Sequence, residues 1–246
     1  MRRLLLAAVL TFAAHGGLAS AQPAPPPAGV AAHAKRVPLI LDARAFDPGR
    51  VLAPPPPAGS GIEKAELAVL HQIQTTRAPE RLEQARQDDE HEDVFIFSAA
   101  IGPAFDLNAL PATRRALETV ANDQAILAKI AKDDFKRPRP YVIDPTLESC
   151  ERSTAKPLTS YPSGHATLGY SLAYVLQALL PQKADAIGAR ADDYAYSRLV
   201  CGVHYRSDVE AGRVLGTWVG KAMLTSPAFQ PQLEAARAEL KAAGLR

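Results

Sequence analysis

Apolar residues recur at three- and four-residue intervals along most of this chain, and that spacing leaves it few folds. A buried helix face has this spacing because a helix turns once in about 3.6 residues. Alternation of apolar and polar residues, which marks a half-buried strand, never lasts beyond a few positions. With 246 residues the chain can bury a full core, and no internal boundary divides it. We therefore predict an all-α fold, a single-domain helical bundle.

Prolines and glycines separate the expected helices. The last strong helix is predicted to begin at Ser207, where Ser207 and Glu210 form a capping-box pattern, and Trp218 is expected in its buried face. The expected helices cover residues 63–87, 111–132, 164–180, 184–198 and 207 onward.

The N-terminus has the order of parts of an export signal. Arg2 and Arg3 precede the apolar run 4–10, and small residues at 19–21 follow at the distance of a cleavage site. The apolar run is too short to cross a bilayer core of about 30 Å, so no stable membrane anchor is expected after cleavage. Residues 1–21 are therefore predicted to be a signal peptide.

Repeated prolines mark residues 22–60, and they resist both helices and central strands. This segment is predicted to be an extended arm, and its apolar residues 39–41 are expected to dock on the body of the protein. The helical domain is then expected to span residues 61–246.

The charge distribution argues against a nucleic-acid partner. Removal of residues 1–21 takes away two of the 28 basic residues and none of the 26 acidic ones, so the formal net charge falls from +2 to zero. Nucleic-acid binders need clustered Lys and Arg that neutralise phosphates, and this chain has no such cluster. The acidic stretch 88–93 is expected to be a solvated helix end, because no spaced calcium-binding loop follows it.

Cys150 and Cys201 are the only cysteines, and they lie in separate motif regions. An even count in an exported protein favours a disulfide between them. Two unrelated buried thiols are the alternative.

Three segments gather polar side chains that would be costly to bury without a ligand. They contain Lys132 and Arg139, then Ser163 and Gly164, then Arg198. Two guanidinium groups and an ammonium can surround the oxygens of a phosphate, each guanidinium as a two-pronged donor. Gly164 opens a helix, whose free N–H groups and positive end favour an anion. These residues predict a phosphate site.

Two histidines supply reacting groups for phosphoryl transfer. His204 precedes Asp208 by four residues, so on a helical turn both side chains lie on one face. Asp208 can then keep one ring nitrogen of His204 protonated and leave the other free to attack phosphorus. His165 follows Gly164 and can donate a proton to the leaving oxygen. Because His165 must start protonated while His204 must start free, an acidic pH optimum is expected.

Together the segments read Lys132-x6-Arg139-Pro140, Pro162-Ser163-Gly164-His165 and Ser197-Arg198-x5-His204-x3-Asp208. This pattern resembles the three-part signature of the type-2 phosphatidic-acid phosphatase and vanadium haloperoxidase superfamily, and every signature position is filled. Residues 54–57, 97–98, 160–165 and 200–202 further resemble the bacterial class A non-specific acid phosphatases. The chain departs from that family at Lys136-Arg137-Pro138, at Ala166 where threonine is usual, and at Tyr205 where tryptophan is expected.

The resemblance implies roles for the site residues. His204 would be the nucleophile that forms a phosphohistidine, His165 the general acid, and Asp208 the residue that orients His204. The residues implied to bind phosphate are Lys132, Arg139, Ser163, Gly164 and Arg198. The resemblance also implies an all-helical fold, hydrolysis of small phosphate monoesters with broad specificity, no metal or other cofactor, a periplasmic location and frequent homodimers.

Two other functions fit parts of the pattern. A vanadate-dependent haloperoxidase would bind vanadate at the same histidine, because vanadate mimics phosphate, although the chain is short for that group. A non-catalytic phosphate-binding protein would need the cations but would gain nothing from a proton donor at His165.

Overall fold

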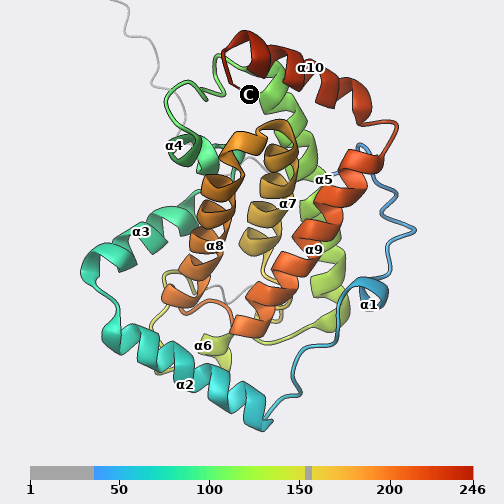
Figure 1. The fold of residues 1–246 in the computed structure, drawn as a ribbon. Helices are drawn as coiled ribbons and strands as arrows, with labels where there is room; N and C mark the ends of the chain where they lie inside the picture. Colours follow the sequence, from blue (N-terminus) through green and yellow to red (C-terminus); the bar gives the residue numbers. More distant parts are fainter. Residues whose placement is uncertain (1–35, 153–156, 246) are drawn as a thin grey trace, which may run out of the picture. The chain divides into compact units, whose positions relative to one another are not determined.

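The computed structural model describes residues 36–152 and 157–245, and among these residues it contains helices and no strand. The predicted all-α fold is confirmed for this part of the chain (Figure 1). The expected signal peptide, residues 1–21, and residues 22–35 of the arm lie outside the described residues. The helices, in chain order, are α1 (Pro48–Val51), α2 (Gly61–Thr76), α3 (Pro79–Glu90), the 3-10 helix η1 (Val94–Phe97), α4 (Ser98–Ile101), α5 (Pro111–Phe135), α6 (Pro140–Ile143), α7 (Gly164–Leu179), the 3-10 helix η2 (Pro181–Lys183), α8 (Ala184–Val200), α9 (Arg206–Thr225) and α10 (Gln230–Ala242). No helix within the described ranges has the length and apolar character that a membrane span requires.

Helix α7 lies at the centre of the core and packs against α5, α8 and α9 (Figure 1). Its side chains Leu168, Leu172, Val175 and Leu176 are each at most 1% exposed. Full burial of one such side chain contributes about 1.5–3 kcal/mol. Because other helices cover α7 on several sides, α7 is apolar around much of its circumference. The same packing holds its N-terminal end in a fixed position.

Glycines allow α9 to approach α7 closely. Gly212, Gly216 and Gly220 recur every four residues and face α7. A Cβ at Gly216 would lie 2.5 Å from the carbonyl oxygen of Thr167, which is closer than any side chain tolerates. The two helices that carry the second and third sequence motifs therefore pack backbone against backbone.

The prediction of a single helix over residues 63–87 is wrong, because the helix is interrupted between α2 and α3. Ala78 is extended (φ −68°, ψ 150°), as the residue before a proline prefers. Pro79 then takes the first position of α3, where its missing N–H costs nothing. The break turns the end of α3 toward α8, with which it packs.

The predictions for α5, α7 and α8 are confirmed, whereas the start of the last expected helix is wrong in detail. Helix α9 begins at Arg206, and Asp208 rather than Ser207 provides its cap by accepting the Tyr205 N–H at 2.9 Å. Glu210 pairs with Arg213 instead of capping the helix. A further helix, α10, packs on α5 and has no counterpart among the expected helices.

Trp218 was expected in the core, and this prediction is wrong. It remains 38% exposed, and its ring centroid lies 5.6 Å from that of Phe46. The tryptophan is therefore a partly covered contact for the segment before α1.

The predicted docking of residues 39–41 is confirmed, but a buried carboxylate contributes to it. The backbone N–H groups of Leu39, Ile40 and Leu41 all donate to Asp123 of α5, at 2.8 to 2.9 Å. Asp123 is 1% exposed. Ile40 and Leu41 pack on the core, while Leu39 is 56% exposed. Three N–H donors thus satisfy a charge that would otherwise be costly to bury.

Candidate active site

Helix ends and the turns between helices bring the predicted site residues together. Ser163 and Asp208 are linked directly, because the Ser163 N–H donates to the Asp208 carbonyl oxygen at 2.9 Å. Lys132 reaches the second motif, since its Nζ donates to the Thr159 carbonyl oxygen at 2.5 Å. The predicted residues lie as follows: Lys132 near the end of α5, Arg139 directly before α6, Ser163 as the N-cap of α7, Gly164 and His165 in its first turn, Arg198 in the last turn of α8, His204 in the turn after it, and Asp208 in the first turn of α9.

His204 lies between Asp208 and Arg139. Its Nδ1 is 3.3 Å from Asp208 Oδ2, and its Nε2 is 3.1 Å from Arg139 Nη1. A guanidinium can only donate, so Nε2 accepts and Nδ1 carries the ring proton. Burial, together with the nearby charge of Arg139, holds the pKa of His204 well below its ordinary value. The neutral ring therefore presents an unprotonated nitrogen to the cationic side of the site.

Asp208 is fully buried and surrounded by donors. It accepts from the Ser160 hydroxyl at 2.5 Å and from the Tyr205 N–H at 2.9 Å. Burial raises the pKa of Asp208, and the charge of Arg137 opposes that effect. Since these partners donate hydrogen bonds, they favour the ionised carboxylate.

Arg137 is a site residue that sequence reasoning missed. It is 4% exposed, its Nη1 lies 2.7 Å from Asp208 Oδ1, and its guanidinium lies 3.8 Å from the centroid of the Tyr205 ring. Its Nη2 also pairs with Glu66 at 3.1 Å. Arg137 and Asp208 are 71 residues apart, so no local pattern joins them. The only signal in the sequence is general: a buried carboxylate needs a cation.

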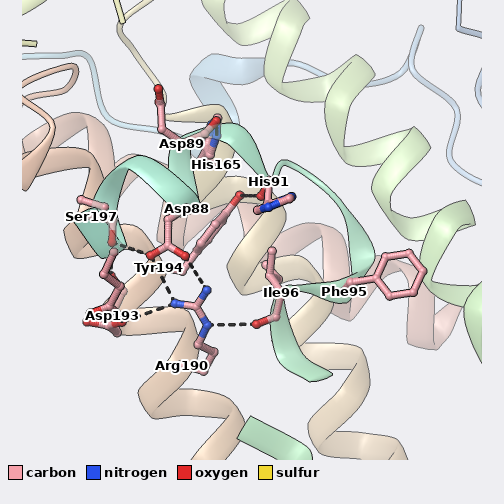
Figure 2. A network of polar contacts seen from close by, with 12 residues as sticks. Asp88, Asp89, His91, Phe95, Ile96, His165, Arg190, Asp193, Tyr194 and Ser197 are labelled. Atoms are coloured by element: carbon pink, nitrogen blue, oxygen red, sulfur yellow. Dashed lines mark hydrogen bonds and ion pairs between the residues drawn. The ribbon is translucent and has the colours of Figure 1, made fainter. Parts of the chain in front are cut away.

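His165 is held by the end of α3 and by the segment that follows it (Figure 2). Its Nε2 is 3.2 Å from the Asp89 carbonyl oxygen, and its Nδ1 is 3.6 Å from Glu92 Oε1. A carbonyl oxygen only accepts, so Nε2 carries a proton and Nδ1 is the nitrogen left to exchange one. Burial and the charge of Arg198 lower the pKa of His165 well below its ordinary value. A charge on His165 would in turn lower the pKa of His204, so the two rings interact electrostatically.

The acidic stretch 88–93 is only in part the solvated helix end that was expected: Glu90 and Glu92 are exposed, whereas Asp88 and Asp89 are not. Asp89 Oδ1 lies 2.5 Å from Arg198 Nη1, and the two side chains are only 11% and 2% exposed. Asp88 is 5% exposed and is held between Arg190 and the Ser197 hydroxyl, at 2.5 and 2.6 Å (Figure 2). This network fixes the end of α3 against α8, and it places Asp89 within reach of Arg198.

The cations of the site keep donors available for an anion. Among the described residues, the buried Nε atoms of Arg139 and Arg198 have no hydrogen-bond partner. A buried donor left unsatisfied costs about 1–3 kcal/mol, which an oxygen ligand would offset. Burial, followed by the charge of Arg139, lowers the pKa of Lys132 to about 7. We call Lys132, Arg139, Ser163, Gly164 and Arg198 the phosphate cradle.

A disulfide and a glycine fix the turn that carries His204. Cys150 and Cys201 form the expected disulfide, and the Cys150 N–H donates to the Cys201 carbonyl oxygen at 3.0 Å. Gly202 has a φ of +64°, and a Cβ there would lie 2.3 Å from the Glu148 carbonyl oxygen. Only glycine fits both the backbone conformation and the space. The turn is therefore pressed against the loop after α6.

This chain is similar to several known proteins. Residues 114–231 match the model of the PAP2 superfamily. The non-specific acid phosphatase of Providencia stuartii is 30% identical over 81% of this chain and 83% of its own length. The acid phosphatase of Zymomonas mobilis is 33% identical over 80% of this chain and 76% of its own length. The crystal structure of the first bacterial vanadium-dependent iodoperoxidase aligns with a TM-score of 0.49 and 21% identity, over 71% of this chain and 52% of that chain.

The two relatives match more than two thirds of this chain and of their own lengths. This extent of identity shows common descent along the domain rather than a shared short motif. The chain therefore belongs to the PAP2 superfamily and, within it, to the class A non-specific acid phosphatases, a family of phosphatase enzymes.

Proposed function

We propose that this protein hydrolyses phosphate monoesters with broad specificity, at acid pH, through a phosphohistidine intermediate on His204. The observation that carries the proposal is the 3.1 Å contact between His204 Nε2 and the Arg139 guanidinium, while Nδ1 faces Asp208. Nε2, the unprotonated nitrogen of the ring, thus points at Arg139, the cation that would hold the phosphoryl group. The names of the relatives, both acid phosphatases, support the class of substrate.

In the proposed first step, His204 Nε2 forms a bond to phosphorus while the bond from phosphorus to the ester oxygen breaks. His165 Nδ1 gives its proton to that oxygen, and the alcohol leaves. The phosphate cradle donates to the three remaining oxygens, whose charge must be stabilised during transfer. Asp208 stabilises the positive charge that develops on the imidazole of His204.

In the second step, a water molecule attacks phosphorus on the side that the alcohol has left. His165 takes a proton from this water, and the bond between nitrogen and phosphorus breaks as phosphate forms. His204 returns to its neutral form, with Nδ1–H still directed at Asp208. Each histidine thereby ends the cycle in its starting state.

The charges of the site link binding to proton transfer. Burial, together with the cations of the cradle, lowers the pKa of His165, so the free enzyme holds this ring neutral at pH 7. A bound phosphate group brings about two negative charges and reverses this influence. His165 is then protonated when substrate is present, as a general acid must be.

Replacement His204→Ala tests the nucleophile. We expect no detectable turnover of p-nitrophenyl phosphate and no acid-labile phosphoenzyme after rapid quenching with labelled substrate. His71→Gln is the matched control, because His71 pairs with Asp144 and belongs to none of the three motifs. Near-normal turnover in the His204 variant would rule out the phosphohistidine mechanism. Because the cradle itself neutralises the transferred group, treatment with a chelator is expected to leave turnover unchanged.

We further propose that residues 1–21 direct export to the periplasm, where the disulfide can form. N-terminal sequencing of the mature protein should find a start close to residue 22. Recovery of the uncleaved chain in the cytoplasm would contradict this part of the proposal.

A further inference from the structure

Glu92 stands on the side of the site where the leaving group must be. In-line transfer places the leaving oxygen opposite the attacking nitrogen of His204, beside His165. Since the Nε2 proton of His165 is bound by the Asp89 carbonyl group, Nδ1 is the nitrogen that serves this oxygen. The same Nδ1 lies 3.6 Å from Glu92 Oε1.

A second contact places Glu92 against the phosphate cradle. A Cβ built on Gly164 would lie 3.3 Å from Glu92 Oε1, so the carboxylate reaches the first residue of α7. Half of the Glu92 side chain is exposed, at 50%. Glu92 therefore borders both the transferred group and the solvent through which the leaving group extends.

Apart from His165, the charge of Glu92 has no ion-pair partner among the described residues. Asp89 already pairs with Arg198, and Lys132 and Arg139 remain to balance about two negative charges on the phosphoryl group. No lysine or arginine in the described ranges forms an ion pair with Glu92, whose charge reaches Lys132 only at longer range. With phosphate bound, the leaving group consequently meets the Glu92 carboxylate beside the ring of His165, and this carboxylate keeps its charge after His165 has given up its proton.

We propose that Glu92 selects substrates by the charge of the leaving group, an inference that rests on the proposed function. Phosphate esters of amino alcohols, whose ammonium group lies close to the ester oxygen, are favoured. Esters of hydroxy acids, and esters with a second phosphate on the leaving group, are disfavoured. An exposed ion pair changes a binding constant by up to about fivefold, and attraction and repulsion act in opposite directions on the two classes.

The test uses three small esters: phosphoethanolamine, propyl phosphate and phosphoglycolate, whose leaving groups are cationic, neutral and anionic. We measure kcat/KM for each with the wild-type enzyme and with Glu92→Gln, at a pH where phosphoglycolate has an ionised carboxylate. The ratio of variant to wild type for one ester removes differences in intrinsic reactivity. We expect about a fivefold loss for phosphoethanolamine, a gain of similar size for phosphoglycolate, and little change for propyl phosphate.

The control Glu90→Gln makes the same change in net charge at an exposed residue of α3, and it should leave all three ratios near one. High salt should weaken the discrimination of the wild type, because Glu92 is exposed. Equal changes for all three esters in Glu92→Gln would overturn the proposal, since they would show an effect through His165 alone. Turnover retained in His204→Ala would instead defeat the proposed function, so the two failures are distinguishable.

Discussion

Replacement of Arg137 by alanine is the sharpest test of how the site is held together. In Arg137→Ala, Asp208 would keep its hydrogen bonds to Ser160 and Tyr205 but lose its only ion pair with a lysine or arginine among the described residues. The paired side chains are 3% and 0% exposed, so solvent screening is slight. Breaking a buried ion pair on one side costs about 3–5 kcal/mol. That loss is a large part of the stability of a typical domain, about 5–15 kcal/mol.

The same loss has a distinct signature in activity. Burial already raises the pKa of Asp208, and Arg137 opposes this effect. Without Arg137, the pKa of Asp208 rises further, because about 3 kcal/mol of ion-pair energy no longer favours the ionised carboxylate. Asp208 is then protonated at acid pH, where it no longer stabilises a positive charge on His204. We expect kcat/KM to fall about 100-fold at acid pH and to recover as the pH rises.

The measurements are urea denaturation and kcat/KM for p-nitrophenyl phosphate from acid to neutral pH. Arg137→Lys keeps the charge but loses the two-pronged contact, so it should recover part of both losses. Arg213→Ala is the control, because Arg213 and Glu210 form an exposed pair, at 47% and 56%, which contributes at most about 1 kcal/mol. A stable Arg137→Ala protein with an unchanged pH profile would refute this account of Asp208.

Three other predictions concern packing, pH and the disulfide. Gly216→Ala places a Cβ 2.5 Å from a backbone carbonyl oxygen of α7, so overpacking of about 1–3 kcal/mol should exceed the gain in helix propensity and reduce kcat. In the control Gly188→Ala, the new Cβ meets only a side-chain atom at 3.3 Å, so urea denaturation should find this variant neutral or stabilised. The pKa values of His165 and His204 are both lowered, so His204 stays free in mild acid while His165 loses its proton as the pH rises. We therefore expect kcat/KM to decline as the pH rises from acid to neutral, and a profile that is flat up to alkaline pH would contradict the role of His165. Reduction of the disulfide, which spans 51 residues, should lower the free energy of unfolding by about 4 kcal/mol in the loop-entropy model. Urea denaturation with and without reductant measures this loss, and an unchanged midpoint would contradict the expected contribution of the disulfide.

Local patterns were sufficient to predict the helices that form the core and the residues that gather at the site. Periodicity identified α5, α7 and α8, because burial of one face imposes its spacing on the sequence. It failed at Pro79, where the preference of one residue outweighs a continuous apolar pattern. It also failed at Trp218, since the same spacing does not reveal whether a neighbouring element covers the end of a helix face.

Ion pairs between distant segments could not be predicted. The acidic stretch 88–93 was expected to be solvated, because its partners Arg190 and Arg198 lie more than 100 residues away. The same reason hid the role of Arg137, whose carboxylate partner belongs to another motif. Composition tells how many charges must be balanced, but only the fold decides which of them meet.

One arrangement of charges underlies both substrate affinity and acid dependence in the proposed mechanism. The cations of the phosphate cradle are held close together by helix ends, so each disfavours further positive charge in the site. Burial lowers the pKa of both histidines and this repulsion lowers it further, and a bound phosphate group relieves the repulsion. Substrate binding therefore promotes protonation of His165 at the moment when the leaving oxygen needs a proton. His204 does not lose its free nitrogen in the same way, because its Nε2 faces the Arg139 guanidinium and its Nδ1 proton faces Asp208. The environment thus assigns opposite roles to two chemically identical rings.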